Sequence, residues 1–290
     1  MKRALRSRSR AVQGLLGLLA AGGVSATACE QPKERVPSVC VGRCGFPSEE
    51  GGGLPQGGRG GDDENEGGEA GESPGVTLTS SVLLLNDLDF KSGGPFMDSA
   101  EIRVQKQGGG SVTGRWNGAS GNDPFRIEKV LEGRAVWALG TPASALNNDA
   151  LATLEPVRTD KPNSGGVVEA DPFALVRAST MENIYDLLTV PITLDPSRAQ
   201  IVLRVVTDAG AGIAGIRVTA PSAEVVVYAA SGAFSDAATE TDNTGLVVLA
   251  NTPGSEWPGS LVSVSFAGAD TGAADLRVIS GAVTVVSVRP

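Results

Sequence analysis

The sequence predicts an all-β fold made of two antiparallel β-sandwich domains with one short helical insert. Three observations predict it. Between residues 76 and 290, short runs of Val, Ile, Leu and Phe alternate with polar residues and are separated by Gly, Asn, Asp and Pro. Helical periodicity is confined mainly to one place in this region. The residues before it, 29–75, are too rich in Gly and acidic side chains to form a core.

The chain begins with a pattern typical of an export signal. The first ten residues carry five positive charges and no negative charge, and the next fourteen are apolar apart from Gln13. This apolar run is too short for a membrane-spanning helix, which needs about 20 residues. We therefore expect residues 1–28 to be a signal peptide and the protein to be exported.

Cys29 stands at the expected cleavage point. Ala26-Thr27-Ala28 satisfies the small-residue rule of ordinary signal peptidase. Together with Cys29 the same residues resemble the lipobox of bacterial lipoproteins, although Ala26 stands where Leu is commonest. The resemblance implies that Cys29 carries several acyl chains and holds the protein in the cell envelope. Glu30, in place of the Asp associated with inner-membrane retention, favours the outer membrane.

The cysteine count bears on the same question. Cys29, Cys40 and Cys44 are the only cysteines of the chain, and Cys40 and Cys44 are close enough to form a disulfide in an oxidising compartment. Ordinary cleavage would then leave Cys29 as an odd free thiol, whereas lipidation consumes it. A zinc site is disfavoured because the chain has no His and no fourth Cys. We expect no metal and no cofactor.

Residues 29–75 are expected to form a disordered linker behind the lipidated cysteine. Residues 51–75 contain eleven Gly and six acidic residues against one Arg, so they cannot offset the entropy of ordering. A coil of this length spans on the order of 40 Å, and its negative charge extends it further. The interpretation is a tether that lifts the body away from the membrane.

The charge balance excludes one class of partner. Loss of the five positive charges of the signal changes the formal net charge from −9 to −14. No cluster of Lys and Arg exists outside the signal, whereas binding to nucleic acid or to anionic headgroups needs a basic surface. We therefore expect no nucleic-acid partner.

The body is expected to divide near residues 195–200 into a first domain, 76–197, and a second domain, 198–290. Its expected strands are the apolar runs at residues 101–106, 125–131, 201–207, 224–230, 246–250, 261–266 and 282–288. One helix is predicted over residues 180–188. Thr180 is its expected N-cap, and its apolar face is predicted to consist of Met181, Ile184, Tyr185 and Leu188.

The second domain shows four segments in a fixed order: "RVVTDAGAGIAGIRVTAP", "TETDNTGLVVLANTPG", "LVSVSFAG" and the final "GAVTVVSV". Asp208 and Gly210 are predicted to form one tight turn, and Asp242 and Gly245 another. The run resembles the carboxypeptidase regulatory-like, or transthyretin-like, module over about 90 residues. The resemblance implies an Ig-like or prealbumin-like sandwich without catalytic residues. "SEWPG" at 255–259 departs from the family pattern.

The first domain resembles the module less. "DPFRIEKVLEGRAVWAL" is similar to its unit of strand, Gly turn and strand. The insertion from Thr141 to Val190 has no counterpart in the family. We expect a second sandwich that carries the helical insert.

Two motif matches have simpler explanations. Gly210, Gly212 and Gly215 fit the GxGxxG dinucleotide fingerprint, but the β-branched residues that follow them predict a strand and not the helix that the fingerprint must open. Exposed acidic residues of the loops, such as Asp236, Glu240, Asp242 and Asp270, could chelate calcium, but solvated turn carboxylates are the more common case.

The absence of His excludes a Ser-His-Asp triad, a Cys-His dyad and His-ligated metal sites. A carboxylate pair acting on sugars is the one hydrolytic alternative that remains, and it would need a deep cleft. We expect no enzyme activity and no catalytic residue.

The expected function is that of a non-catalytic envelope lipoprotein whose sandwiches contact another protein or a glycan. Of the three Trp residues, Trp116 and Trp137 are expected to pack in the core, and Trp257, beside Pro258, is the candidate ligand contact. The alternative is a secreted carbohydrate-binding protein released by ordinary signal cleavage.

Overall fold

The computed structural model describes residues 38–40, 75–88, 93–118, 124–144, 149–268 and 271–290. These residues form many strands and one short helix, so the all-β prediction is confirmed. The predicted signal peptide, Cys29, Cys44 and the acidic Gly-rich stretch lie outside the described residues. Strand β1 (Ser38–Cys40) is described by its backbone pairing alone.

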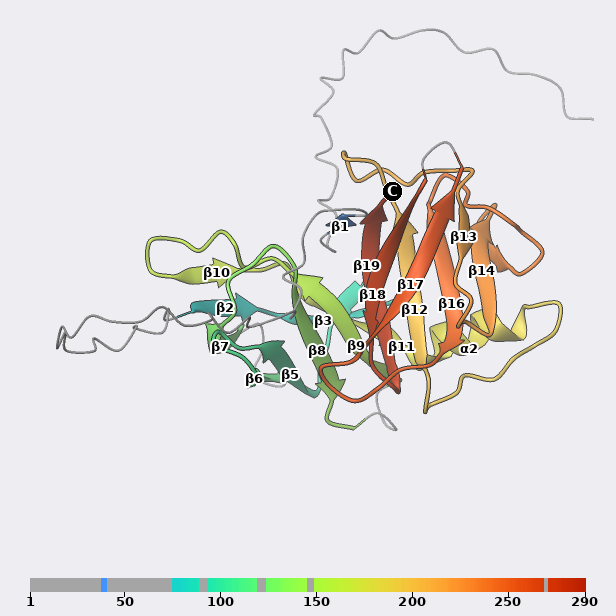
Figure 1. The fold of residues 1–290 in the computed structure, drawn as a ribbon. Helices are drawn as coiled ribbons and strands as arrows, with labels where there is room; N and C mark the ends of the chain where they lie inside the picture. Colours follow the sequence, from blue (N-terminus) through green and yellow to red (C-terminus); the bar gives the residue numbers. More distant parts are fainter. Residues whose placement is uncertain (1–37, 41–74, 89–92, 119–123, 145–148, 269–270) are drawn as a thin grey trace, which may run out of the picture. The chain divides into compact units, whose positions relative to one another are not determined.

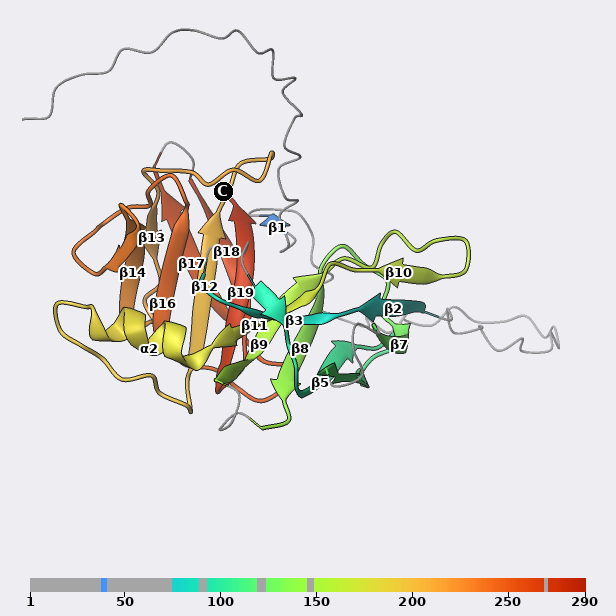
Figure 2. The same cartoon turned by 180° about the vertical axis from the view of Figure 1, so that it is seen from behind.

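The second half of the body is a sandwich covered by a helix. Its elements are α2 (Ala178–Asp186), β12 (Ala199–Val205), β13 (Arg217–Thr219), β14 (Val225–Ala230), β15 (Ala233–Ser235), β16 (Leu246–Thr252), β17 (Ser260–Ala267), β18 (Gly272–Val278) and β19 (Ala282–Arg289). Five strands run in the order β15-β14-β16-β12-β19, and three more form a separate sheet in the order β13-β17-β18. Figure 1 shows β17 and β18 in front of the five strands, and Figure 2, from behind, shows α2 in front of them.

The alternation of side chains along each strand explains these three layers. In β16 and β19 the even-numbered and odd-numbered residues point to opposite faces of the sheet. Val247 and Val286 pack with the three-stranded sheet. Val248 and Val285 pack with α2. Every residue of β16 is buried because both faces of the sheet are covered.

β19 connects the two halves of the body. On one edge it pairs in parallel with β12, from Gln200↔Val283 to Val205↔Val288. Its residues Ala282–Thr284 also pair in parallel with β9 of the first half. The sheets are therefore mixed and not purely antiparallel, and strand pairing is continuous across the predicted domain boundary. The boundary itself stays a prediction.

The first half forms a second sandwich. Its strands are β2 (Val76–Ser80), β3 (Val82–Leu85), β4 (Gly93–Pro95), β5 (Ser99–Gln105), β6 (Ser111–Asn117), β7 (Phe125–Val130), β8 (Val136–Pro142), β9 (Ala150–Val157), β10 (Val167–Glu169) and β11 (Phe173–Arg177). The sheet β10-β2-β7 shares a core with β5, β6, β8 and β11. The predicted unit of strand, Gly turn and strand is therefore split, because β7 and β8 belong to different sheets.

Helix α2 differs from its prediction at the N-terminus. It begins at Ala178, so Thr180 lies inside the helix and is not its cap. The first turn is capped from a distance: Asp149, in the left-handed conformation, accepts hydrogen bonds from the backbone N–H (2.7 Å) and the hydroxyl of Ser179. Such a cap satisfies an N–H group that the helix itself leaves open. Sequence periodicity cannot reveal a cap that lies 30 residues upstream.

Three residues of the predicted apolar face lie in the helix, and the fourth, Leu188, follows its end at Asp186. Met181, Ile184, Tyr185 and Leu188 are all buried, and they pack on the five-stranded part of the second sandwich. The helix therefore covers the second sandwich, although its sequence lies before β12. Helix α2 has nine residues, and no helix in the described ranges is long and apolar enough to span a bilayer.

A buried polar network fixes this helix against the sheet. The hydroxyl of Tyr185 donates to Oε1 of Gln200, which also accepts the backbone N–H of Asn251 at 2.8 Å. Nδ2 of Asn251 donates to the backbone oxygen of Thr193 at 2.9 Å and to Oε2 of Glu224 at 2.7 Å. Each buried polar atom here has a partner, which avoids the cost of an unpaired group.

A second polar feature lies where β9 and β11 separate. Backbone pairing between these strands covers only Ala150 and Leu151 of β9. Beyond it, Oγ1 of Thr153 accepts the N–H of Val176 at 3.2 Å, and Oε1 of Glu155 accepts the N–H of Ala174 at 3.3 Å. The two side chains thus replace the carbonyl partners that the diverging strand no longer offers. Burial raises the pKa of Glu155 to about 8.

Glu155 makes stability depend on pH in a defined window. In the unfolded chain this carboxyl ionises near its ordinary pKa of 4.5, whereas in the folded protein it keeps its proton to about pH 8. The folded state therefore holds more protons between these values, and the free energy of unfolding falls as pH rises through them. Glu155→Gln keeps an acceptor for Ala174 and cannot ionise.

We expect urea unfolding of Glu155→Gln to show less loss of stability from pH 5 to pH 8 than the unchanged chain. Glu169→Gln, at an exposed position of β10, is the matched control and should keep the original slope. If the free energy of unfolding fell equally with pH in Glu155→Gln and in the unchanged chain, Glu155 would not be the source of the pH dependence.

Candidate contact surface

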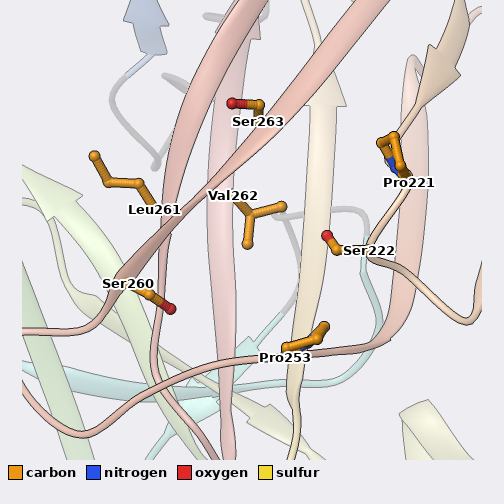
Figure 3. A pocket seen from close by; sticks show the side chains of 7 residues that line it. All are labelled: Pro221, Ser222, Pro253, Ser260, Leu261, Val262 and Ser263. Atoms are coloured by element: carbon orange, nitrogen blue, oxygen red, sulfur yellow. The ribbon is translucent and has the colours of Figure 1, made fainter.

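An open groove lies on the second sandwich where three segments meet. It is lined by Pro221 and Ser222 after β13, Pro253 after β16 and Ser260–Ser263 at the start of β17 (Figure 3). Its volume is about 410 Å³. Val262 is 7% exposed and belongs to the core below, whereas Leu261 is 60% exposed. The groove is therefore built on a packed strand.

The alternation of β17 places the lining residues. Val262, Val264 and Phe266 face the core, so Leu261 and Ser263 must face solvent. The segment before β14 is held by a turn in which the N–H of Ala223 donates to the backbone oxygen of Ala220 at 3.0 Å. The core-packed strand and this turn thus hold two of the segments that line the groove.

The chemistry of the groove is apolar with hydroxyl groups. None of its seven lining residues carries a charge, and three are serines. Charged residues occur only beside it: Arg277 is the cross-strand partner of Leu261, and the hydroxyl of Ser263 donates to Asp275. Such a surface can bury apolar groups and exchange hydrogen bonds, but it offers no pair of carboxylates for acid–base chemistry.

Trp257, the predicted ligand contact, is only partly exposed. Its side chain packs against a cluster that contains Trp137, Leu154 and Ile279. The Trp257–Pro258 peptide bond is cis, and the backbone oxygen of Pro258 accepts a hydrogen bond from Nη1 of Arg277 at 2.8 Å. Trp257 thus lies beside the groove, in the loop that leads into β17, and not among the residues that line it.

The other two tryptophans are in the core. Trp116 is 2% exposed and Trp137 is 3% exposed. Nε1 of Trp116 donates to the backbone oxygen of Phe96 at 2.8 Å. Both residues pack as the sequence analysis expects.

Asp208 and Gly210 lie in a turn after β12. The N–H of Gly210 donates to the backbone oxygen of Thr207 at 2.9 Å, with φ of +79° at the glycine. Asp208 is almost fully exposed and lies 3.8 Å from the guanidinium of Arg289. The GxGxxG match lies in this loop, and strand β13, not a helix, follows it.

Asp242 and Gly245 form the turn that leads into β16. Oδ1 of Asp242 accepts the N–H of Thr244 at 2.9 Å, and its backbone oxygen accepts the N–H of Gly245 at 3.0 Å. Gly245 has φ of +70°, and a Cβ there would lie 2.1 Å from the backbone oxygen of Val205. Both the turn and the close approach require glycine at this position.

The acidic loop residues do not assemble into a metal site in the described ranges. Asp236 accepts the N–H of Thr189 at 3.2 Å and its hydroxyl at 2.9 Å, and these bonds lower the pKa of that carboxyl. The carboxylate of Asp242 accepts the N–H of Thr244 within its own turn. No group of three or more His, Cys, Asp or Glu residues that could hold a metal occurs in the part of the chain that the structure describes. Asp270 lies outside those residues.

The groove was not predicted from the sequence. The one available signal was Leu261, a large apolar residue that shares the outward face of β17 with Ser263 and Ser265. Pro221 and Pro253 come from other segments, and their position beside β17 depends on the tertiary fold. A lining of this kind has no fixed spacing in the sequence.

Comparisons with known proteins give only a distant likeness of fold. No family model matches the chain, and no curated protein matches it. A streptococcal ancillary pilin shares 12% identity, with 74% of this chain and 68% of that chain covered and a TM-score of 0.21. A candidate cell adhesion protein from Bacteroides eggerthii shares 10% identity, with 76% and 88% covered and a TM-score of 0.24. Likenesses at these scores carry no argument about function.

The turn at Gly245 can be tested against a matched glycine. Gly232 has φ of +88°, and no atom lies within 4 Å of the position that a Cβ would take there. Gly232→Ala should therefore lower the free energy of unfolding only by the penalty for a left-handed backbone at alanine, about 1–2 kcal/mol. Gly245→Ala adds a clash between the new Cβ and the backbone oxygen of Val205, so it should lower the free energy of unfolding at least about twice as much. Urea unfolding measures both, and equal losses would show that the approach to Val205 does not constrain the turn.

Proposed function

We propose that the chain is a non-catalytic lipoprotein of the cell envelope, held by lipid on Cys29, that contacts another protein or a glycan through the groove on its second sandwich. The observation that carries the contact role is the groove itself. It is open, uncharged and rich in hydroxyl groups, and it is held by core-packed strands. Binding surfaces of this kind combine apolar area with a few polar groups that fix orientation.

Leu261 is the residue on which the proposed contact depends most. At 60% exposure it offers apolar area that the fold itself does not use. The neighbouring Ser260 and Ser263 supply hydroxyl groups on either side of it. An isolated exposed Leu needs no explanation. Leu261 differs because it belongs to the lining of the groove, although its side chain points away from Pro221 and Pro253 (Figure 3).

The envelope location rests on the N-terminal sequence. The basic and apolar segments before Cys29 support export, and the lipobox-like residues at 26–29 support lipidation. Several acyl chains would make the attachment effectively permanent, because each buried methylene contributes about 0.8 kcal/mol. We further propose the outer membrane, and we propose that the second sandwich is a variant of the carboxypeptidase regulatory-like module.

The lipid anchor can be tested by mass. Intact mass of the native chain from the membrane fraction should show a mature N-terminus at Cys29 with added acyl chains, and Cys29→Ala should move the protein out of that fraction. An unmodified mass that begins at Cys29 would support the secreted alternative instead.

The groove can be tested with matched charge substitutions. Leu261→Asp places a charge in the groove, whereas Leu187→Asp places one at a position of similar exposure, 69%, outside it. We expect Leu261→Asp to weaken retention of the purified body on envelope fractions or on a glycan array at least about tenfold, and Leu187→Asp to leave it unchanged. Trp257→Ala is added to the set because loss of retention on the glycan array alone would indicate stacking of a sugar on this ring, whereas loss on envelope fractions alone would indicate protein contact. Equal retention by all variants would contradict a role for this surface.

A further inference from the structure

The strand β1 bears on how the body is attached to the membrane. β1 pairs in parallel with the end of β19, with the register Ser38↔Ser287, Val39↔Val288 and Cys40↔Arg289. Every strand has two edges, and β12 occupies one edge of β19 from Val283 to Val288. β1 must therefore lie on the other edge.

That other edge is only partly used by the rest of the fold. β9 pairs with Ala282, Val283 and Thr284, and beyond Leu154 it no longer pairs with β19, although it continues against β8. Among the described strands, β1 is the one that pairs with this edge of β19 beyond Thr284. β1 supplies the missing neighbour.

The number of residues between Cys29 and β1 limits how far the lipid can lie from the body. Only residues 30–37 lie between Cys29 and β1, and they can span at most about 30 Å. In the sequence, the acidic Gly-rich residues come after β1 and before β2, so they are not part of the chain between Cys29 and β1.

We propose that residues 38–40 act as a docking strand on the free edge of β19, and that this strand, and not the acidic Gly-rich stretch, sets the distance between the lipid on Cys29 and the β-sandwich body. The lipid part of this inference rests on the proposed function. The acidic stretch is then a connection that starts and ends on the body, and its length does not affect the distance to the membrane. This reverses the tether interpretation drawn from composition.

The docking strand comes from the same chain and not from a second copy. Residues 41–75 link β1 to β2, so β1 is present near the edge at an effective concentration on the order of millimolar. A second copy would compete at its much lower solution concentration. Strand addition of this kind depends on main-chain hydrogen bonds, which any extended segment can supply.

A cross-link tests the docking. In the full chain with Cys29, Cys40 and Cys44 changed to Ser, the pair Ser38→Cys and Ser287→Cys should form an intrachain disulfide, because the two residues are in register. The control pair, Ser38→Cys and Ser265→Cys, places the second thiol on the outward face of β17 and should not cross-link. Absence of the first bond, or its formation only between two chains, would overturn the docking in cis.

Hydrogen exchange gives an independent test in the chain with its native cysteines. Val39→Pro removes a donor from β1, so the amides of Ser287–Arg289 that point to this edge should exchange at least about tenfold faster. Gly60→Pro, in the connection to β2, is the control and should change nothing there. Unchanged protection in Val39→Pro would also overturn the proposal.

The distance can be tested on the lipidated protein in vesicles. Energy transfer between a dye at the C-terminus and an acceptor lipid should stay the same when residues 51–70 are deleted, and should become sensitive to that deletion in the Val39→Pro background. A change on deletion in the otherwise unchanged chain would overturn the role of β1. A chain without lipid would overturn the anchor and the spacing together, while the cross-link would still decide the docking.

Discussion

β19 is the strand on which the rest of the structure depends. It is paired with β12 on one edge and with β9 and β1 on the other, and its first seven residues are buried. A strand that is covered on both faces needs apolar side chains on both, and "AVTVVSV" supplies them. Its neighbours on both edges run parallel to it, so each comes from a distant part of the sequence. The two sandwiches are therefore not independent units joined by a linker, because they share a sheet through this strand.

Burial of polar groups is the second constraint. Gln200, Asn251 and Tyr185 lie in the interior, where an unpaired amide or hydroxyl would cost about 1–3 kcal/mol. Their mutual hydrogen bonds avoid that cost and also fix the position of α2 on the sheet. Glu155 is different, since its burial is tolerated by keeping its proton and by accepting the N–H of Ala174. One polar cluster thus selects a single packing of the helix, and the other holds the place where two strands separate.

Local patterns predicted seven of the described strands but not their partners, and they missed most strands of the first sandwich. All seven runs expected as strands coincide with observed strands, because alternation reports one buried face directly. The three buried apolar residues of α2, Met181, Ile184 and Tyr185, were also evident from their spacing, whereas the cap on Asp149 and the position of the helix on the second sandwich are tertiary facts. The parallel pairings of β19 were not predicted, since nothing in a single strand tells which distant strand will pair with it. The groove at Leu261 was missed for the same reason, as its prolines come from separate loops.

The shared strand has a consequence for the order in which the protein can fold. Residues 282–289 follow every other described strand in the sequence, and they pair with residues about 130 positions earlier in β9. Neither sandwich can complete its sheet before residues 282–289 are available for pairing. Contacts of such long range slow folding, because the entropy of closing a large loop is lost before any strand pairing compensates for it. The assembly of the two halves is thereby coupled, because both wait for the same strand.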